Sequence, residues 1–284
     1  MKHITFLLAL IAFCVRPVPA AQPAAITAAQ PPRRIISLLP SHTEILFALG
    51  VTGVIAVSNF CDYPPKKTAA LEKAGDYYNP NIEKILSLKP DIVFTGNWKS
   101  VPASGRLRRA GINALEIPDA DCIAGIYENI RRIGAAAGKS KEAANLVKSL
   151  TAKVAAATAK YSAAKPRPRV YIELDAPHWT AGGRSFLNET LENAGGENIF
   201  RDLEKPYAQV SWETIVQRNP DVIITLSAAK TNFAALPGAN RIAAVRNGRV
   251  ISSLDKNLLT RPSPRIYLAI EALGQALHEQ KNRR

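Results

Sequence analysis

A segment made of a helix, a Pro-Asp pair and a strand occurs twice in this chain, and this repeat constrains the fold more than any other feature. The first copy is NIEKILSLKPDIVFTG, from Asn81 to Gly96, and the second is SWETIVQRNPDVIITL, from Ser211 to Leu226. Each copy reads as a short helix that ends at the proline and continues into a buried strand. Two such units predict a chain built from two similar α/β halves.

Strands and helices alternate in both halves of the sequence. We expect strands at residues 34–40, 54–58, 92–95 and 113–117, and again at 170–174, 222–225 and 250–253. This alternation predicts mostly parallel sheets, which bind ligands at the carboxyl ends of their strands. Ser41 and Glu44 also have the spacing of a capping box at the start of a helix. The predicted fold class is therefore α/β, with two similar Rossmann-like lobes and a ligand cleft between them.

A long segment without glycine or proline separates the two halves. It runs from Ser140 to Ala164, and as a helix it would span roughly 37 Å, more than one small lobe needs. We therefore expect a rigid helix that joins the lobes. The predicted division is a signal peptide at residues 1–20, a leader at 21–33, an N-terminal lobe at 34–138, a linking helix at 139–165 and a C-terminal lobe at 166–284.

The N-terminus has the pattern of a secretory signal peptide. Lys2 precedes an apolar run from Ile4 to Val15, and the small-residue site at 18–20 predicts cleavage after Ala20. The apolar run is too short to span a membrane. Lipid attachment at Cys14 is a weaker alternative, because the bulky Phe13 precedes it. The sequence thus predicts export to the periplasm.

Charge and cysteine content narrow the class of protein further. The formal net charge is +14, but the basic residues are dispersed, which argues against nucleic-acid binding. Cys61 and Cys122 remain after signal cleavage. An exported protein can form a disulfide, and their spacing leaves a bond and two free thiols equally open.

Several stretches resemble one family. The stretches RIISLLPSHTEILFALG, CDYPPKK, LENAGGENIF, PYAQVSWETIV and RPSPRI are similar to those of periplasmic substrate-binding proteins of ABC transporters, of the helical-backbone class and the cobalamin (vitamin B12)-binding type. The resemblance covers nearly the whole mature chain. It implies a monomeric protein that holds a corrinoid between two lobes and delivers it to a permease dimer in the inner membrane. Haem and ferric-siderophore binders share part of the pattern and remain the alternatives.

The resemblance also implies which residues contact the ligand. Carried over by position, they are Ser41, Phe60, Tyr77, Trp179, Tyr207, Asp255 and Arg261. Trp98 is added to them, although it is displaced from the place of Gly96, where the family pattern has this tryptophan. Rigid aromatic faces with a few polar anchors suit a broad macrocycle with amide arms. Tyr77 and Tyr207 depart from the pattern, which has tryptophan at both positions, and the loop that joins Asp255 to Arg261 is two residues longer.

Two histidines and two glutamates occupy matching places in the halves. His42 and His178 follow the first strand of each half, and imidazole is a suitable axial ligand for cobalt or iron. An ordinary polar role is the alternative for both. Glu83 and Glu213 follow the expected N-caps Asn81 and Ser211, where a carboxylate also favours the helix dipole. The resemblance implies that they dock onto the permease.

No enzyme signature is present in the sequence. It has no nucleophile elbow, phosphate loop or dinucleotide fingerprint, so we expect no catalysis and no catalytic cofactor. A hydrolase and an extracytoplasmic sensor or scaffold are the competing classes. Ligand turnover would identify the first, and function without a permease would identify the second.

Overall fold

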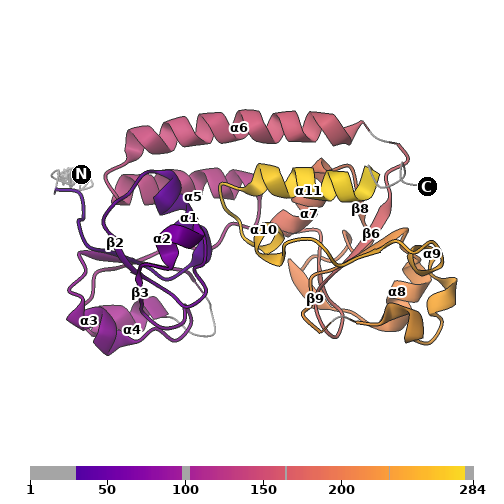
Figure 1. Ribbon diagram of the computed structural model, residues 1–284, viewed down its shortest axis with the longest axis horizontal. Coiled ribbons are helices and arrows are strands. Elements are labelled where there is room, and N and C mark those ends of the chain that lie inside the picture. Colours follow the sequence, from indigo (N-terminus) through magenta and orange to yellow (C-terminus); the bar gives the residue numbers. More distant parts are fainter. Residues whose placement is uncertain (1–29, 98–102, 164, 230, 279–284) are drawn as a thin grey trace, which may run out of the picture. The chain divides into compact units, whose positions relative to one another are not determined.

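A computed structural model describes residues 30–97, 103–163, 165–229 and 231–278 of the chain. The compact unit that carries the fold begins at Pro31. Within it, two sheets lie below a layer of long helices (Figure 1). The predicted signal peptide and its cleavage site lie outside the described residues, as does Trp98.

The N-terminal lobe contains a five-stranded parallel sheet. Its strands are β1 (Ile35–Ser37), β2 (Val54–Val57), β3 (Glu72–Lys73), β4 (Ile92–Thr95) and β5 (Ala114–Glu116), in the order β3-β2-β1-β4-β5. The helices of this lobe are α1 (Pro40–Ala48), α2 (Pro65–Thr68), α3 (Ile82–Ser87) and α4 (Ala103–Arg109). Buried apolar side chains cover both faces of the sheet, as expected for parallel strands.

The C-terminal lobe contains a mixed sheet. Its strands are β6 (Arg169–Asp175), β7 (Trp179–Ala181), β8 (Glu197–Asn198), β9 (Tyr207–Gln209), β10 (Val222–Thr225) and β11 (Val250–Ile251). The order is β11-β10-β6-β7-β9, and β8 also pairs with β6. Its helices are α7 (Phe186–Asn193), α8 (Trp212–Arg218), α9 (Ala243–Arg246) and α10 (Lys256–Thr260), with 3₁₀ turns at Phe233–Ala235 and Ala239–Arg241. The two-lobed α/β prediction is confirmed, but β7 runs antiparallel to both β6 and β9.

Two adjacent glycines explain how the antiparallel strands fit into the second sheet. A Cβ atom at Gly182 would lie 2.1 Å from the Lys205 carbonyl oxygen, and one at Gly183 would lie 2.0 Å from the Arg201 carbonyl oxygen. Only glycine permits such a close approach of two backbones. The glycines therefore let the segment before β9 pack against the end of β7.

Three long helices form the layer above the sheets. They are α5 (Ile123–Ala136), α6 (Ser140–Ser162) and α11 (Ile266–His278), and α6 lies along both of the others (Figure 1). One apolar cluster runs through this layer and reaches both sheets. At Gly274 on α11, a Cβ atom would lie 2.4 Å from the ring of Tyr161 on α6, so the glycine is needed for the two helices to pack closely. The linking helix was thus predicted correctly as one long element.

The sequence repeat has a structural role in each lobe. The Asp91 carboxylate accepts hydrogen bonds from the backbone N–H groups of Arg33 and Arg34, at 2.7 and 2.8 Å. The Asp221 carboxylate accepts one from the Arg169 N–H at 2.9 Å. Each aspartate therefore fixes the start of the central strand, β1 or β6, beside the strand of the repeat, β4 or β10. These bonds lower the pKa of Asp91, since they favour its ionised form.

The expected capping box at Ser41 and Glu44 is absent. Helix α1 begins at Pro40, with Leu39 as an N-cap that makes no side-chain hydrogen bond. Proline suits the first helical position because it lacks the N–H that a cap would satisfy. The Ser41 and Glu44 side chains are thereby left for contacts outside the helix.

Among the described residues, no helix is long and apolar enough to cross a membrane.

Candidate functional site

A cavity of about 540 Å³ opens between the two lobes, and its walls are mostly apolar. This volume lies in the usual range for small-molecule pockets. The N-terminal lobe contributes Leu39, Pro40, Ser41, Tyr77, Asn97, Pro118, Asp119, Ala120 and Asp121. The C-terminal lobe contributes Leu174, Asp175, Ser185, Phe186, Leu187, Pro206, Tyr207, Lys256, Thr260, Arg261 and Pro262.

The wall on the N-terminal lobe is built from loops that follow strands. Ser41 comes shortly after β1, Asn97 after β4 and Asp119 after β5. These are the carboxyl ends of parallel strands, the usual place for a ligand in such a sheet. The Ser41 hydroxyl donates a hydrogen bond to Asp119 Oδ1 at 2.6 Å. This bond connects the start of α1 to the loop after β5.

One tyrosine from each lobe lines the cavity. The Tyr77 ring packs against Phe60 and Tyr78, with ring centroids 5.2 and 5.0 Å away. Tyr207 begins β9 and keeps 41 % of its surface exposed. Desolvation by the cavity walls raises the pKa of Tyr77, and it raises that of Tyr207 to about 12. Both phenols therefore stay protonated at neutral pH and can donate hydrogen bonds as well as present a ring face.

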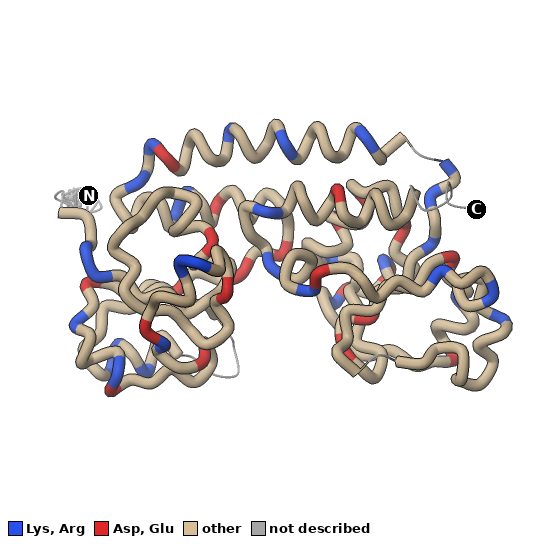
Figure 2. The backbone as a smooth tube through the Cα atoms, in the orientation of Figure 1, with Lys and Arg blue, Asp and Glu red and all other residues tan. Residues whose placement is uncertain are grey.

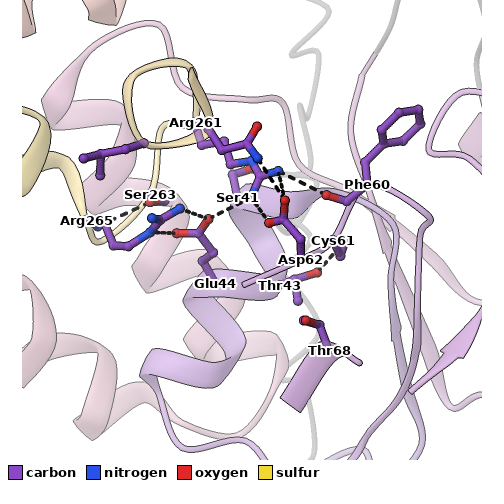
Figure 3. A network of polar contacts seen from close by, with 12 residues as sticks. Ser41, Thr43, Glu44, Phe60, Cys61, Asp62, Thr68, Arg261, Ser263 and Arg265 are labelled. Carbon is purple, nitrogen blue, oxygen red and sulfur yellow. Dashed lines mark hydrogen bonds and ion pairs between the residues drawn. The ribbon is translucent and has the colours of Figure 1, made fainter. Parts of the chain in front are cut away.

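Arg261 lines the cavity while it bonds to the opposite lobe. Its guanidinium forms an ion pair with the Asp62 carboxylate and donates a hydrogen bond to the Phe60 carbonyl oxygen at 3.2 Å. A second carboxylate, that of Glu44, lies 3.4 Å away. Partial burial opposes ionisation of Asp62, but the hydrogen bond and charge of Arg261 outweigh it and lower the Asp62 pKa. Figure 3 shows these groups pointing toward one another.

A second arginine completes the contact between the lobes. Arg265 donates two hydrogen bonds to the Glu44 carboxylate, at 2.8 and 2.7 Å (Figure 3). Its guanidinium also lies over the Tyr63 ring, 3.9 Å from the centroid. Glu44 is buried, and a buried carboxylate requires such paired, hydrogen-bonded charge. We call Glu44, Asp62, Arg261 and Arg265 the interlobe network.

The structure brings part of the predicted ligand site together. Ser41, Tyr77, Tyr207 and Arg261 all line the cavity. Phe60 packs against Tyr77, and Trp179 is 44 % exposed on β7, but neither lines the cavity. Asp255 caps α10 by accepting hydrogen bonds from the N–H groups of Asn257 and Leu258, so its carboxylate is already engaged.

Neither histidine lies in the cavity lining. His42 is fully buried, and its ring nitrogens have no hydrogen-bond partner among the described residues. Burial, together with the charge of Arg132, lowers its pKa to about 3. The buried His42 ring therefore does not reach the cavity in this structure, and an axial role for it stays a prediction. His178 Nδ1 lies 3.3 Å from Glu173 Oε1, and its ring stacks on Trp212.

The two cysteines that remained open are not bonded to each other. Both are free thiols in the structure. Cys61 is buried and contacts the hydroxyls of Thr43 and Ser58, at 3.1 and 3.2 Å. Cys122 is the N-cap of α5, and its sulfur accepts a hydrogen bond from the Gly125 N–H. Each thiol thus has a separate local role.

The sequence analysis missed the charged residues of the cavity other than Arg261. Asp119 and Asp121 follow β5, Asp175 ends β6 and Lys256 begins α10. The signal that could have revealed the aspartates is their position directly after predicted strands, where parallel sheets place their ligand-binding loops.

Two α/β lobes joined by a long helix, with an open cavity between them, define a two-lobed binding protein. The periplasmic binding protein family model matches residues 35–256, and the chain belongs to this family. The family serves transporters and is not enzymatic.

Similar proteins agree with this assignment. The chain is 34 % identical to an uncharacterised ABC transporter substrate-binding lipoprotein, YvrC, of Bacillus subtilis, over 89 % of this chain and 82 % of the relative. It is 32 % identical to a vitamin B12-binding protein of Salmonella typhimurium, over 87 % and 90 %.

Solved structures show the same arrangement. The periplasmic vitamin B12 binding protein BtuF of Vibrio cholerae superposes with a TM-score of 0.75 and 29 % identity, over 89 % of this chain and 99 % of that one. The periplasmic heme-binding protein RhuT from Roseiflexus sp. RS-1 superposes equally well, with 26 % identity over 87 % and 98 %. The class of protein is therefore established, and similarity alone leaves the ligand open between these chemistries.

Proposed function

We infer that the protein captures cobalamin or a related corrinoid in the cavity between its lobes and delivers it to an ABC permease. The observation that carries this inference is the cavity with one tyrosine on each wall, in a chain that is 32 % identical to a vitamin B12-binding protein. A broad macrocycle can lie between such faces, while Ser41 and Arg261 offer polar anchors at its edge.

The arrangement of the lobes supports capture without large rearrangement. The interlobe network and the long helix α6 connect the lobes at separate places. A second cross-lobe bond runs from the Ile123 N–H to the Glu189 carboxylate at 2.7 Å. A cavity whose walls are held in place in advance loses less entropy when a ligand binds. We also propose that the N-terminal lobe spans residues 34–138, the linking helix 139–165 and the C-terminal lobe 166–284.

Haem is the second candidate, and the tyrosines are the observation that bears on it. A tyrosine oxygen can ligate haem iron as its phenolate. Tyr77 and Tyr207 both line the cavity, so each is a candidate for this role. A corrinoid needs only the ring faces and hydroxyls of these tyrosines, and the 32 % identity to a vitamin B12-binding protein is the reason to place it first. Ferric siderophores remain a third ligand class to be tested.

Delivery requires a partner, for which the lobe ends offer matching acidic residues. Glu83 on α3 and Glu213 on α8 are both exposed, and no described residue forms an ion pair or hydrogen bond with either carboxylate. Under this proposal they contact basic residues of a permease dimer in the inner membrane. The protein acts as a monomer in the periplasm, after cleavage of a signal peptide at residue 20.

A direct binding experiment tests the ligand. The purified mature protein is mixed separately with cyanocobalamin, haem and a ferric hydroxamate, desalted, and measured by absorption spectroscopy. We expect the corrinoid spectrum to co-elute with the protein at a ratio near one to one. Co-elution of haem or the siderophore instead would assign the cavity to that ligand, and the cobalamin proposal would be wrong.

A matched pair of variants links binding to the cavity. Tyr207→Ala removes a cavity wall, whereas Tyr267→Ala removes a partly buried tyrosine of α11 that does not line the cavity. Only the first variant should lose the corrinoid on desalting. Equal retention by both would place the binding site elsewhere.

A further inference from the structure

We propose that Asp119 makes the cavity selective for ligands whose peripheral arms are uncharged, such as amides, and excludes the same ligands when those arms are carboxylates. This inference deepens the proposed function and rests on it, because it concerns the charge class of the ligand that enters the same cavity. It is carried by the balance of charged groups on the cavity walls.

Acidic groups outnumber free basic groups in the cavity lining. The lining residues with ionisable acids are Asp119, Asp121 and Asp175, and the basic ones are Lys256 and Arg261, among the residues that the structure describes. A carboxylate on a ligand would therefore meet more like charge than opposite charge. Like charges a few ångströms apart repel measurably at the dielectric of a protein surface.

Arg261 cannot easily offset this acidity, since its charge is already engaged. Its guanidinium pairs with Asp62 and lies close to Glu44, which Arg265 also binds. The interlobe network thus contains two arginines and two carboxylates and is balanced internally. Lys256 is the remaining cation of the described lining, against three aspartates.

Asp119 is the acidic residue of the described lining that bonds to another lining residue. Its Oδ1 accepts the Ser41 hydroxyl at 2.6 Å, which holds the carboxyl group against the start of α1. The side chain is exposed to the cavity. Desolvation by the walls raises its pKa, while the Ser41 hydrogen bond favours the ionised carboxylate and opposes this rise. Its charge also contributes to the raised pKa values of Tyr77 and Tyr207. Its field therefore reaches both tyrosines that line the cavity.

The acidity of the cavity contrasts with the charge of the whole protein. The formal net charge of the sequence is +14, and lysines and arginines are spread over both lobes and α6 (Figure 2). The overall field attracts anions at long range. A selective binder in that field needs a local element that rejects anionic ligands at the site, and the aspartates of the cavity supply it.

The test compares amide and carboxylate forms of one ligand. Cyanocobalamin and its monocarboxylate derivatives, in which one propionamide arm is hydrolysed, are titrated into the wild type and into Asp119→Asn by calorimetry. The wild type should bind the carboxylate forms roughly tenfold more weakly than cyanocobalamin, an effect of the size that one nearby like charge produces. In Asp119→Asn this difference should shrink to about threefold or less, because the amide keeps the acceptor for Ser41 but carries no charge.

Two controls separate charge from structure. Glu128→Gln removes an exposed carboxylate of α5 that does not line the cavity, and it should leave the discrimination unchanged. High salt should reduce the discrimination of the wild type and barely change that of Asp119→Asn, since screening acts only on charge. Equal discrimination by the wild type and Asp119→Asn, with cyanocobalamin still bound, would overturn the inference and leave the proposed function standing.

Haem and its dimethyl ester provide the same contrast if corrinoids do not bind. That outcome would refute the proposed ligand, but the two porphyrins still differ in carboxylate charge, with one methyl group added to each esterified arm. Preference of the wild type for the ester, reduced in Asp119→Asn, would uphold the charge selection by Asp119. Preference for the free acid would overturn it.

Discussion

The first helix of each lobe, α1 or α7, ends in the same way but makes different contacts. Gly50 and Gly195 follow them with φ values of 70° and 77°. The Gly50 N–H donates to the Phe47 carbonyl oxygen, and the Gly195 N–H donates to that of Glu192. The N–H of the next residue bonds to Leu46 in one lobe and to Leu191 in the other. These matching bonds align the two helices residue by residue.

Aligned positions of α1 and α7 differ in their residues or in the contacts that those residues make. Glu44 aligns with Glu189, and His42 aligns with Leu187. Glu44 binds two arginines of the opposite lobe, whereas Glu189 accepts one backbone N–H from α5. The first helix of each lobe thus carries an acidic residue that bonds to the other lobe, and the two bonds differ in strength.

The largest expected effect is on stability, and it should differ between Glu44→Ala and Glu189→Ala. Glu44→Ala leaves two buried or half-buried arginines without this partner, and we expect the free energy of unfolding to fall by about 3–5 kcal/mol. Glu189→Ala loses one hydrogen bond to a charged acceptor and should cost about 1.5–3 kcal/mol. Urea unfolding followed by circular dichroism measures both. A larger loss for Glu189→Ala would reverse the comparison.

The exposed glutamates test whether the lobes are equivalent toward a partner. Glu83→Ala with Glu213→Ala should leave ligand affinity unchanged but abolish stable complex formation with the cognate permease in detergent. Truncation of a desolvated interfacial charge costs about 2–5 kcal/mol. Each single variant should weaken the complex partially, because one anchor remains.

Glu204→Ala is a suitable control for the docking experiment, as Glu204 is exposed in the loop before β9. It should form the complex as the wild type does. Loss of ligand binding in the double variant would place the two glutamates in the cavity or the fold instead, and unimpaired uptake in cells would remove their docking role.

Tyr77 and Tyr207 allow the two cavity walls, one from each lobe, to be compared by their contribution to ligand affinity. Tyr77→Ala and Tyr207→Ala should each reduce ligand affinity by about 1–3 kcal/mol, as for buried aromatic anchors. Tyr77 packs against Phe60 and Tyr78, which can partly fill the space it leaves. We therefore expect the larger loss for Tyr207, measured by calorimetry. Wild-type affinity in both variants would mean that the cavity is not the binding site.

His42 occupies the position of Leu187 in the other lobe, and its titration should make the stability of the protein depend on pH. The pKa of His42 is about 3 in the folded protein and about 6.5 when unfolded. Below pH 6.5 the unfolded chain takes up a proton that the folded protein does not, so stability falls as pH decreases. The slope from His42 is roughly 1.4 kcal/mol per pH unit until the pH approaches 3.

His42→Leu installs the residue of the other lobe and should remove this slope. Other groups titrate in both proteins, so the stability difference between the variant and the wild type isolates the histidine. Urea unfolding at pH 7, 6, 5 and 4 should show the variant gaining relative to the wild type at each step. A constant difference would mean that His42 is protonated in the fold or reaches solvent.

Much of the local structure followed from the sequence alone. The strands at 92–95 and 222–225 have the predicted bounds, and Asn81 and Ser211 are N-caps as expected. The linking helix also followed from an uninterrupted run without glycine or proline. These features depend on hydrogen bonds and packing within a few residues, so a short stretch of sequence contains the information that specifies them.

Only the tertiary structure decided which side chains meet across the lobes. Glu44 and Arg265 lie 221 residues apart in the chain, and no local pattern indicates that they pair. The antiparallel strand β7 and the place of Asp119 beside Ser41 also depend on how separate loops converge. The sequence therefore determined two repeated α/β lobes and a connecting helix. The folded arrangement determined the charge of the cavity and the bonds between the lobes, because those contacts form only after distant elements have packed together.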